Sequence, residues 1–247
     1  LEGVEVYDIL EDKRGYIWLA TQNGLIRYDG YEFKRHYYNP NDSATIKSIV
    51  IWSLYEDRNG YIWVGCLESL YRYDPATESF KQYAYSGLLD RQMYGNSGIN
   101  SITADKGGRI YFGVASYMGE TITHALFYYD ETEDKLKRFD YPENVDVLNI
   151  GSATTDKEGN VWVTSRSGFF KISPARTLSK IELPAGITSQ ESVFSLRTAI
   201  DQSGTIWIAS ANSALFSFNP STEVFNMYSL KGLTEDDRKP LVPSSIA

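Results

Sequence analysis

The sequence predicts an all-β protein of the β-propeller class, built from four-stranded antiparallel blades. A motif of the form Asp-x-x-Gly-x-aliphatic-aromatic occurs five times in the 247 residues, with its Asp at positions 12, 57, 105, 156 and 201. The intervals are 45, 48, 51 and 45 residues, which is a typical blade length. No stretch shows the i, i+3, i+4, i+7 spacing of apolar residues that an amphipathic helix needs.

The first repeat, residues 1–38, shows how one blade is expected to form. Its first turn carries Asp12, whose carboxylate can accept backbone N–H groups, and Gly15, which tolerates a positive φ. The dipeptides Asn23-Gly24 and Asp29-Gly30 are hairpin signals. These turns separate four expected strands, which cover residues 4–11, 16–21, 25–28 and 32–38.

The other repeats are expected in one domain, over residues 49–83, 99–139, 150–181 and 193–228. In the fifth repeat the hydrophobic phase of the first strand slips by one residue, which predicts a β-bulge. Residues 240–247 resemble the lead-in to the third repeat, and we interpret them as the start of a sixth. Such a chain is expected to be a segment of a larger propeller, with unpaired blade edges that favour self-association.

One large aromatic residue occurs at the same place in every repeat. Burial of such a ring removes roughly 150–250 Å² from water. Because the ring is present in all repeats, we interpret it as core rather than as a ligand platform. The Asp and Gly are interpreted as turn formers, since the turns lack the dense oxygen ligands of a calcium loop. The repeated structural positions are Asp12, Gly15, Trp18, Asp57, Gly60, Trp63, Asp105, Gly108, Tyr111, Asp156, Gly159, Trp162, Asp201, Gly204 and Trp207.

Composition disfavours several kinds of site and partner. A formal net charge of −8 and a pI of about 4.9 disfavour nucleic acid, which binds mainly to cationic surfaces. The single cysteine, Cys66, excludes internal disulfides and a Cys-based zinc cluster, and it is expected to be buried. No apolar run reaches 18 residues and no signal peptide is recognisable, so no membrane contact by this segment is expected. We expect no metal and no cofactor.

The sequence offers little support for catalysis. The two histidines, His36 and His124, belong to different repeats, and His36 is expected to face solvent from an outer strand. No nucleophile elbow, zinc-protease motif or phosphate-binding glycine loop is present, so no catalytic residue is assigned. A carboxylate pair stays open as an alternative, because acidic residues are plentiful. Trp52, at the place of Tyr7 in the first repeat, is interpreted as core, with channel lining as the alternative.

Two enlarged connections suggest a binding site. Residues 84–98 form a long linker, and residues 115–124 replace the tight turn of the third repeat by an insertion. Because successive strands run in opposite directions, both connections leave the blades at the same strand ends, on one face of the propeller. Loops on a rigid scaffold often carry function. The aromatic and polar side chains there suit a polar organic ligand such as a sugar, while packing among the loops or on a neighbouring domain is the alternative. The candidate contacts are Tyr85, Arg91, Tyr94, Asn96, Tyr117, Glu120, His124 and, on the following repeat, Arg166.

The repeats resemble a known family. The five motif copies continue to Gly-Leu-Ile-Arg-Tyr-Asp-Gly at 24–30 and Leu-Tyr-Arg-Tyr-Asp-Pro at 70–75, and these resemble the two-component regulator propeller repeat. The first two repeats match best and the third worst. The resemblance implies a periplasmic sensing module of a hybrid histidine kinase, many of which respond to oligosaccharides. The family has seven-bladed propellers and no shared catalytic motif.

The sequence leaves three hypotheses for the function of this chain. The first is an extracytoplasmic module that senses a carbohydrate or similar small molecule for a two-component signalling protein. The second is a non-catalytic scaffold for protein interaction or dimerisation, which should show an apolar surface patch. The third is a propeller enzyme such as a lyase or glycosidase, which should show converging histidines or carboxylates.

Overall fold

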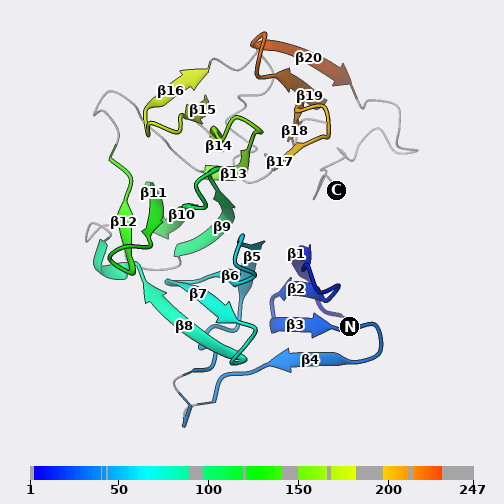
Figure 1. The fold of residues 1–247 in the computed structure, drawn as a ribbon, viewed down its shortest axis with the longest axis vertical. Helices are drawn as coiled ribbons and strands as arrows, with labels where there is room; N and C mark the ends of the chain where they lie inside the picture. The colour runs from blue at the N-terminus through cyan, green and yellow to red at the C-terminus, as the bar shows by residue number, and fades with distance from the viewer. Residues whose placement is uncertain are drawn as a thin grey trace. The chain divides into compact units, whose positions relative to one another are not determined.

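The computed structural model is all-β and consists of five four-stranded sheets. It describes residues 3–39, 41–42, 44–88, 97–118, 121–140, 150–165, 168–181, 197–210 and 214–229. The strands of every sheet are hydrogen-bonded in chain order, so each sheet is a meander, as Figure 1 shows. These sheets coincide with the five predicted repeats, and the predicted fold class is confirmed.

The first three blades have the following bounds. Blade 1 contains β1 (Val6–Glu11), β2 (Ile17–Thr21), β3 (Gly24–Tyr28) and β4 (Phe33–His36). Blade 2 contains β5 (Ile51–Glu56), β6 (Ile62–Cys66), β7 (Ser69–Asp74) and β8 (Ser79–Ala84), and a short 3-10 helix, η1 (Ser86–Leu88), follows it. Blade 3 contains β9 (Ser97–Ala104), β10 (Ile110–Met118), β11 (Thr121–Asp130) and β12 (Lys135–Arg138).

The last two blades follow the same plan. Blade 4 contains β13 (Ile150–Thr155), β14 (Val161–Ser165), β15 (Gly168–Ile172) and β16 (Leu178–Ile181). Blade 5 contains β17 (Arg197–Ile200), β18 (Ile206–Ser210), β19 (Ala214–Asn219) and β20 (Val224–Ser229). The chain divides into two compact units, one of residues 1–102 and 108–139 and one of residues 103–107 and 140–247.

The repeated aspartate joins the first turn of a blade to its core. In blade 1, Oδ1 of Asp12 accepts the backbone N–H groups of Arg14 at 2.9 Å and Tyr16 at 3.0 Å. Its Oδ2 accepts a hydrogen bond from Trp18 Nε1 at 2.9 Å. Burial opposes ionisation of Asp12, but these hydrogen bonds prevail and lower its pKa. The same Trp-to-Asp bond is found for Trp63–Asp57 at 2.8 Å, Trp162–Asp156 at 2.7 Å and Trp207–Asp201 at 2.8 Å.

Each buried tryptophan packs against a ring on the third strand of the following blade. The ring centroids are 5.0 Å apart for Trp18 and Tyr73, and 4.9 Å apart for Trp63 and Tyr129. In blades 4 and 5, Trp162 lies 5.1 Å from Phe218. Trp207 differs from the expected core position because it is only half-buried. Within the described residues its ring partner is Tyr228 of its own blade, and no ring of a following blade covers it.

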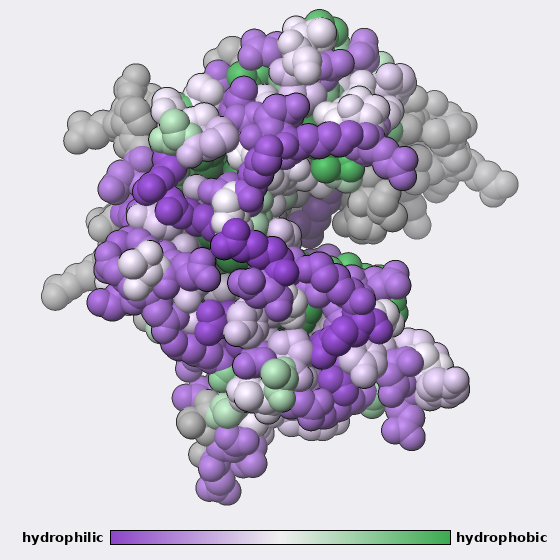
Figure 2. Space-filling model, in the orientation of Figure 1, coloured by the Kyte–Doolittle hydropathy of each residue, from purple (hydrophilic) through white to green (hydrophobic). Residues whose placement is uncertain are grey.

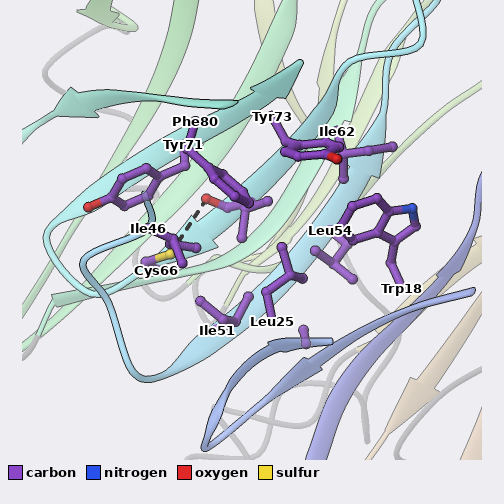
Figure 3. Close-up of a cluster of buried hydrophobic side chains, with 12 residues drawn as sticks. Trp18, Leu25, Ile46, Ile51, Leu54, Ile62, Cys66, Tyr71, Tyr73 and Phe80 are labelled. Carbon is purple, nitrogen blue, oxygen red and sulfur yellow. Dashed lines mark hydrogen bonds between the residues drawn. The ribbon is translucent and has the colours of Figure 1, made fainter. Parts of the chain in front are cut away.

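The junction of blades 1 and 2 contains a large apolar cluster. Trp18 and Leu25 of blade 1 meet Leu54, Ile62 and Tyr73 of blade 2 there, as Figure 3 shows. Cys66 is part of this cluster and is fully buried, as expected for a small core residue. Burial raises the pKa of its thiol, so the thiol stays protonated near neutral pH.

The first strands of blades 1, 2 and 4 contain β-bulges. The register shifts between Val6 and Asp8 in β1, between Ile51 and Ser53 in β5, and between Ile150 and Ser152 in β13. The bulge predicted in the fifth repeat lies outside the described residues.

Short polar contacts join the first strands of neighbouring blades. The backbone N–H of Leu54 donates to Asp8 Oδ2 at 2.8 Å, and Ser53 Oγ donates to the carbonyl of Ile99 at 2.8 Å. Gly65 makes this approach possible, because a Cβ there would lie 2.2 Å from Ser53 Oγ and 2.8 Å from Ile99 Cγ2.

Candidate functional site

The predicted insertion of blade 3 is a hairpin extension rather than a loop. Strand β10 has nine residues and β11 has ten, while β6 and β14 have five. Pairing continues from Ala115↔His124 to Met118↔Thr121. The sequence around Thr121, Ile122 and Thr123 is rich in β-branched residues, which favours strand over loop. The backbones of Tyr117 and His124 therefore lie in paired strands beyond the length of the other blades.

The linker begins in the core. Tyr85 is fully buried, with its ring 6.4 Å from Phe112 and 6.1 Å from Phe127, and its hydroxyl donates to the carbonyl of Cys66 at 3.5 Å. We therefore correct the prediction that Tyr85 faces a ligand, because its side chain fills space between blades 2 and 3. The other predicted contacts in this region, Arg91, Tyr94, Asn96, Glu120 and Arg166, lie outside the described residues. They stay predictions.

The far end of the linker reaches a stacked aromatic pair. Gly98, at the start of β9, forms a bridge with Leu67, which directly follows β6. A Cβ on Gly98 would lie 3.2 Å from Nε1 of Trp52, so the indole borders this glycine. Trp52 in turn stacks on Tyr7 of β1 with centroids 4.4 Å apart and ring planes at 28°. Both rings are half-buried, which is neither the full burial expected of a core residue nor full exposure.

A polar cluster joins blades 2 and 3 at their outer strands. Asp134, which has a φ of 51° in the turn between β11 and β12, accepts hydrogen bonds from Tyr83 at 2.7 Å and Tyr129 at 2.8 Å. It also pairs with Lys81. The hydrogen bond from Lys81 is the largest of the effects that lower the pKa of Asp134. Arg72 donates to the Tyr129 hydroxyl at 3.2 Å and completes the cluster, which we call the second latch.

A small cavity lies beside the second latch. It has a volume of about 370 Å³ and is lined by Tyr83, Gly87, Leu88, Asp134 and Lys135 among others. Gly87 and Leu88 belong to η1, so the cavity opens where the long linker leaves blade 2. Its size is at the lower end of the range for small-molecule sites.

Blades 1 and 2 are joined by the equivalent arrangement, the first latch. Glu78, with a φ of 51°, pairs with Arg27 at 3.2 Å and with Lys34 at 2.9 Å. Arg27 also donates to the Tyr73 hydroxyl at 3.4 Å. A cavity of about 280 Å³ adjoins this latch, and His36 is part of its lining. The repeat of the arrangement indicates that the latches are structural.

His36 faces the protein interior rather than solvent, which corrects the sequence-based expectation. It pairs with the fully buried Leu25 across β3 and β4, and its ring lies 5.6 Å from Trp18, 5.5 Å from Tyr73 and 5.2 Å from Phe80. Its Nε2 is buried and has no hydrogen-bond partner among the residues that the structure describes. Burial, followed by the nearby cations, lowers the pKa of His36 to about 4.

Other kinds of site find no support in the described ranges. Within them, no group of three or more His, Cys, Asp or Glu side chains is placed to hold a metal ion. None of the helices found there is long and apolar enough to span a membrane. In the view of Figure 2, hydrophilic residues dominate the coloured surface and hydrophobic ones form only small groups.

Comparisons with known proteins agree with this architecture. A family model described as two component regulator propeller matches residues 1–23 and 45–68. The first two repeats thus match that family. Histidine kinase P4 of Formosa agariphila is 46% identical over 41 residues, which are 17% of this chain and 3% of that protein.

Solved structures share the fold over nearly the whole chain. The extracellular domain of BT3049 from B. thetaiotaomicron, described as a hybrid two component system, has a TM-score of 0.66 and 24% identity, covering 90% of this chain and 29% of that one. PorZ, a surface component of the type-IX secretion system of Porphyromonas gingivalis, has a TM-score of 0.61 and 14% identity, covering 92% of this chain and 34% of that one. At these identities the likeness shows a propeller fold. This chain spans about a third of either protein.

Proposed function

We propose that this chain is part of an extracytoplasmic sensor propeller of a two-component signalling protein, and that it binds a carbohydrate or a similar polar organic ligand. The family match of the first two repeats supports the signalling context. The extracellular domain with the same fold supports the location outside the cytoplasm. A binding role needs no catalytic group, and His36 is enclosed by aromatic rings.

The observation that carries the binding site is the unequal length of the blade hairpins. The β10–β11 hairpin extends four residue pairs beyond Val114↔Ala125, at the edge where the linker of residues 84–98 enters β9. Both features depart from a repeat that is otherwise regular. Packing of blades requires neither, whereas a binding edge benefits from additional surface on a rigid sheet.

The experiment is an oligosaccharide screen by thermal shift, followed by calorimetry. We expect a binding saccharide to raise the melting midpoint, because a ligand of the native state stabilises it. Arg91→Ala and Tyr117→Ala should weaken binding, by about 1.5–3 kcal/mol for Arg91 if the ligand is charged. Arg58→Ala and Tyr31→Ala are matched controls, since both residues are exposed in turns at the opposite edge of their blades.

Two outcomes would count against the proposal. If no saccharide raises the midpoint, the carbohydrate assignment fails. If a saccharide binds and both site variants bind it as the wild type does, the edge formed by the linker and the hairpin is not the site.

A further inference from the structure

The position of Trp52 is not a repeated core position. It lies five residues before the motif Asp, where the other repeats have Tyr7, Asn100, Gly151 and Leu196. The aromatic core residues recur in all five blades, but only blades 1 and 2 place aromatic rings here. Packing within the blade therefore does not explain them, because Gly151 serves the same place in blade 4.

Both rings stand on β-bulges. The register shifts enclose Tyr7 in β1 and Trp52 in β5, so each is the extra residue of its strand. Bulges change the direction of a side chain and are frequent next to functional sites. Here they bring two rings from different blades into one stack, with centroids 4.4 Å apart. The hydrogen bond from Leu54 N–H to Asp8 Oδ2, one residue beyond Tyr7, fixes the two strands beside each other.

The indole of Trp52 also has an unsatisfied donor. Its Nε1 is buried and has no hydrogen-bond partner in the described part of the chain, whereas the other four tryptophans donate to the motif Asp. A buried donor without an acceptor destabilises the folded chain, so an acceptor from outside would be stabilising. At the point where the linker meets β9, Gly98 lets the backbone pack closely against the indole edge, because a Cβ there would lie 3.2 Å from Nε1 and 3.7 Å from Leu67 Cδ2. At the other ring, the Tyr7 hydroxyl donates to Glu5 Oε2 at 3.2 Å.

We propose that the stacked pair of Tyr7 and Trp52 is the platform on which a neutral saccharide ring packs, with Glu5 accepting a sugar hydroxyl at its border. This inference rests on the proposed function and adds contacts from β1 and β5, where Trp52 borders Gly98 at the end of the linker. The C–H face of a pyranose fits a flat, half-exposed aromatic surface. In the bound state a sugar oxygen supplies Nε1 with the acceptor that it lacks.

The test follows the indole N–H signals of the ¹⁵N-labelled chain by NMR. Trp52→Phe identifies the Trp52 signal, which should lie upfield of the four hydrogen-bonded indoles. The probes are neutral mono- to tetrasaccharides of glucose, galactose, mannose and xylose at millimolar concentration. We expect a binding saccharide to shift the Trp52 signal downfield and to leave the other four in place.

Variants connect the signal to the platform. Tyr7→Ala should weaken binding about tenfold, the effect of losing one aromatic anchor. Tyr31→Ala removes an exposed tyrosine from the opposite edge of the same blade and should have no effect. If a saccharide binds without moving the Trp52 signal and has the same affinity for the Tyr7→Ala variant, the Tyr7–Trp52 pair is not the binding platform, while the proposed function stands. If no saccharide binds by NMR or thermal shift, both are overturned.

Discussion

A single carboxylate holds together the turn and the core of each Trp-containing repeat. In blade 2, Oδ1 of Asp57 accepts the N–H groups of Asn59 at 2.8 Å and Tyr61 at 3.1 Å, while Oδ2 accepts Trp63 Nε1 at 2.8 Å. The tryptophan is thus fixed on two sides, by this bond and by the ring of Tyr129 in blade 3. An indole fits this position better than a benzene ring, because phenylalanine would leave Oδ2 buried without its donor.

We expect Trp63→Ala to lower the free energy of unfolding by about 3–5 kcal/mol, because it deletes a fully buried aromatic side chain. Trp207→Ala is the matched control and should lower it by less, since Trp207 is half-buried and makes the same bond to its Asp. Denaturant melts measure both values. A loss of less than about 1 kcal/mol for Trp63→Ala would contradict the packing described here.

The enclosure of His36 predicts a dependence of stability on pH. Its folded-state pKa of about 4 lies below the ordinary 6.5, so the unfolded chain binds a proton at this site first as the pH falls. Stability should therefore be full above about pH 6.5 and decline toward pH 4. Lys34, Arg27 and Glu78 are the charged groups that influence this histidine.

Urea melts between pH 4 and pH 7.5 provide the measurement. His36→Phe keeps an aromatic ring against Trp18 and Phe80 and should show a flatter profile than the wild type. The difference between the two profiles isolates the histidine from the carboxylates, which titrate in both proteins. Identical profiles would show that His36 is protonated equally in the folded and unfolded chains.

The sequence predicted the repeated residues well because their spacing is repeated five times. It failed for single residues whose environment depends on the register between strands. His36 was assigned to solvent from its outer strand, yet it pairs with buried Leu25 and shares its face. Tyr85 was assigned to a loop surface, yet it directly follows β8 and its buried ring packs near Phe112 and Phe127. A comparison with Tyr83, which takes the place of His36 in blade 2, could have indicated a buried ring.

At the scale of whole elements, the latches connect the outer strands of neighbouring blades. Asp134→Asn should lower the free energy of unfolding by about 1–2 kcal/mol, because the buried hydroxyls of Tyr83 and Tyr129 lose a shared charged acceptor. Asparagine tolerates the positive φ at this position, so backbone strain does not contribute. Denaturant melts of the variant and the wild type give the value.

Lys81→Met is the control for the second latch. It removes a half-exposed cation from the same carboxylate and should cost less than about 1 kcal/mol. An equal or larger loss for Lys81→Met would show that the ion pair, rather than the tyrosine hydroxyls, holds these blades together.

The third repeat shows the limit of prediction for an element. Its deviation from the motif was recognised, and so was the edge at which residues 115–124 lie. Their conformation was not, because the insertion was interpreted as a loop although its Gly119-Glu120 is a two-residue turn signal, and Met118 and Thr121 in fact pair across a hairpin end. Local sequence does not show whether an insertion will extend an existing ladder, since that depends on the strands that precede and follow it.

At the scale of the molecule, blade 1 exposes apolar side chains whose counterparts in blade 2 are buried. Ile9 is 64% exposed, whereas Leu54 at the same place in blade 2 is 7% exposed. Phe33 is 50% exposed, and its counterpart Phe80 is 6% exposed. The exposed side chains thus have the apolar character of an interface between blades.

We expect this face to promote self-association that increases with protein concentration. Ile9→Lys should reduce it by placing a charge in the apolar surface, and sedimentation velocity over a concentration series measures the effect. Tyr31→Ala, which removes a more exposed ring from the β3–β4 turn, should leave association unchanged. A wild-type chain that stays monomeric throughout the series would contradict self-association through the apolar face of blade 1.

The two latches have a direction. In both, the earlier blade supplies arginine and lysine, and the later blade supplies the carboxylate and the tyrosine that accepts from the arginine. In the second latch the earlier blade also contributes Tyr83. Such a surface is complementary to a different surface and not to itself. A symmetric dimer in which two first blades face each other across a two-fold axis therefore cannot use the latch contacts. Association through contacts of this kind is heterologous, and a heterologous contact ends in a closed ring or continues as a filament.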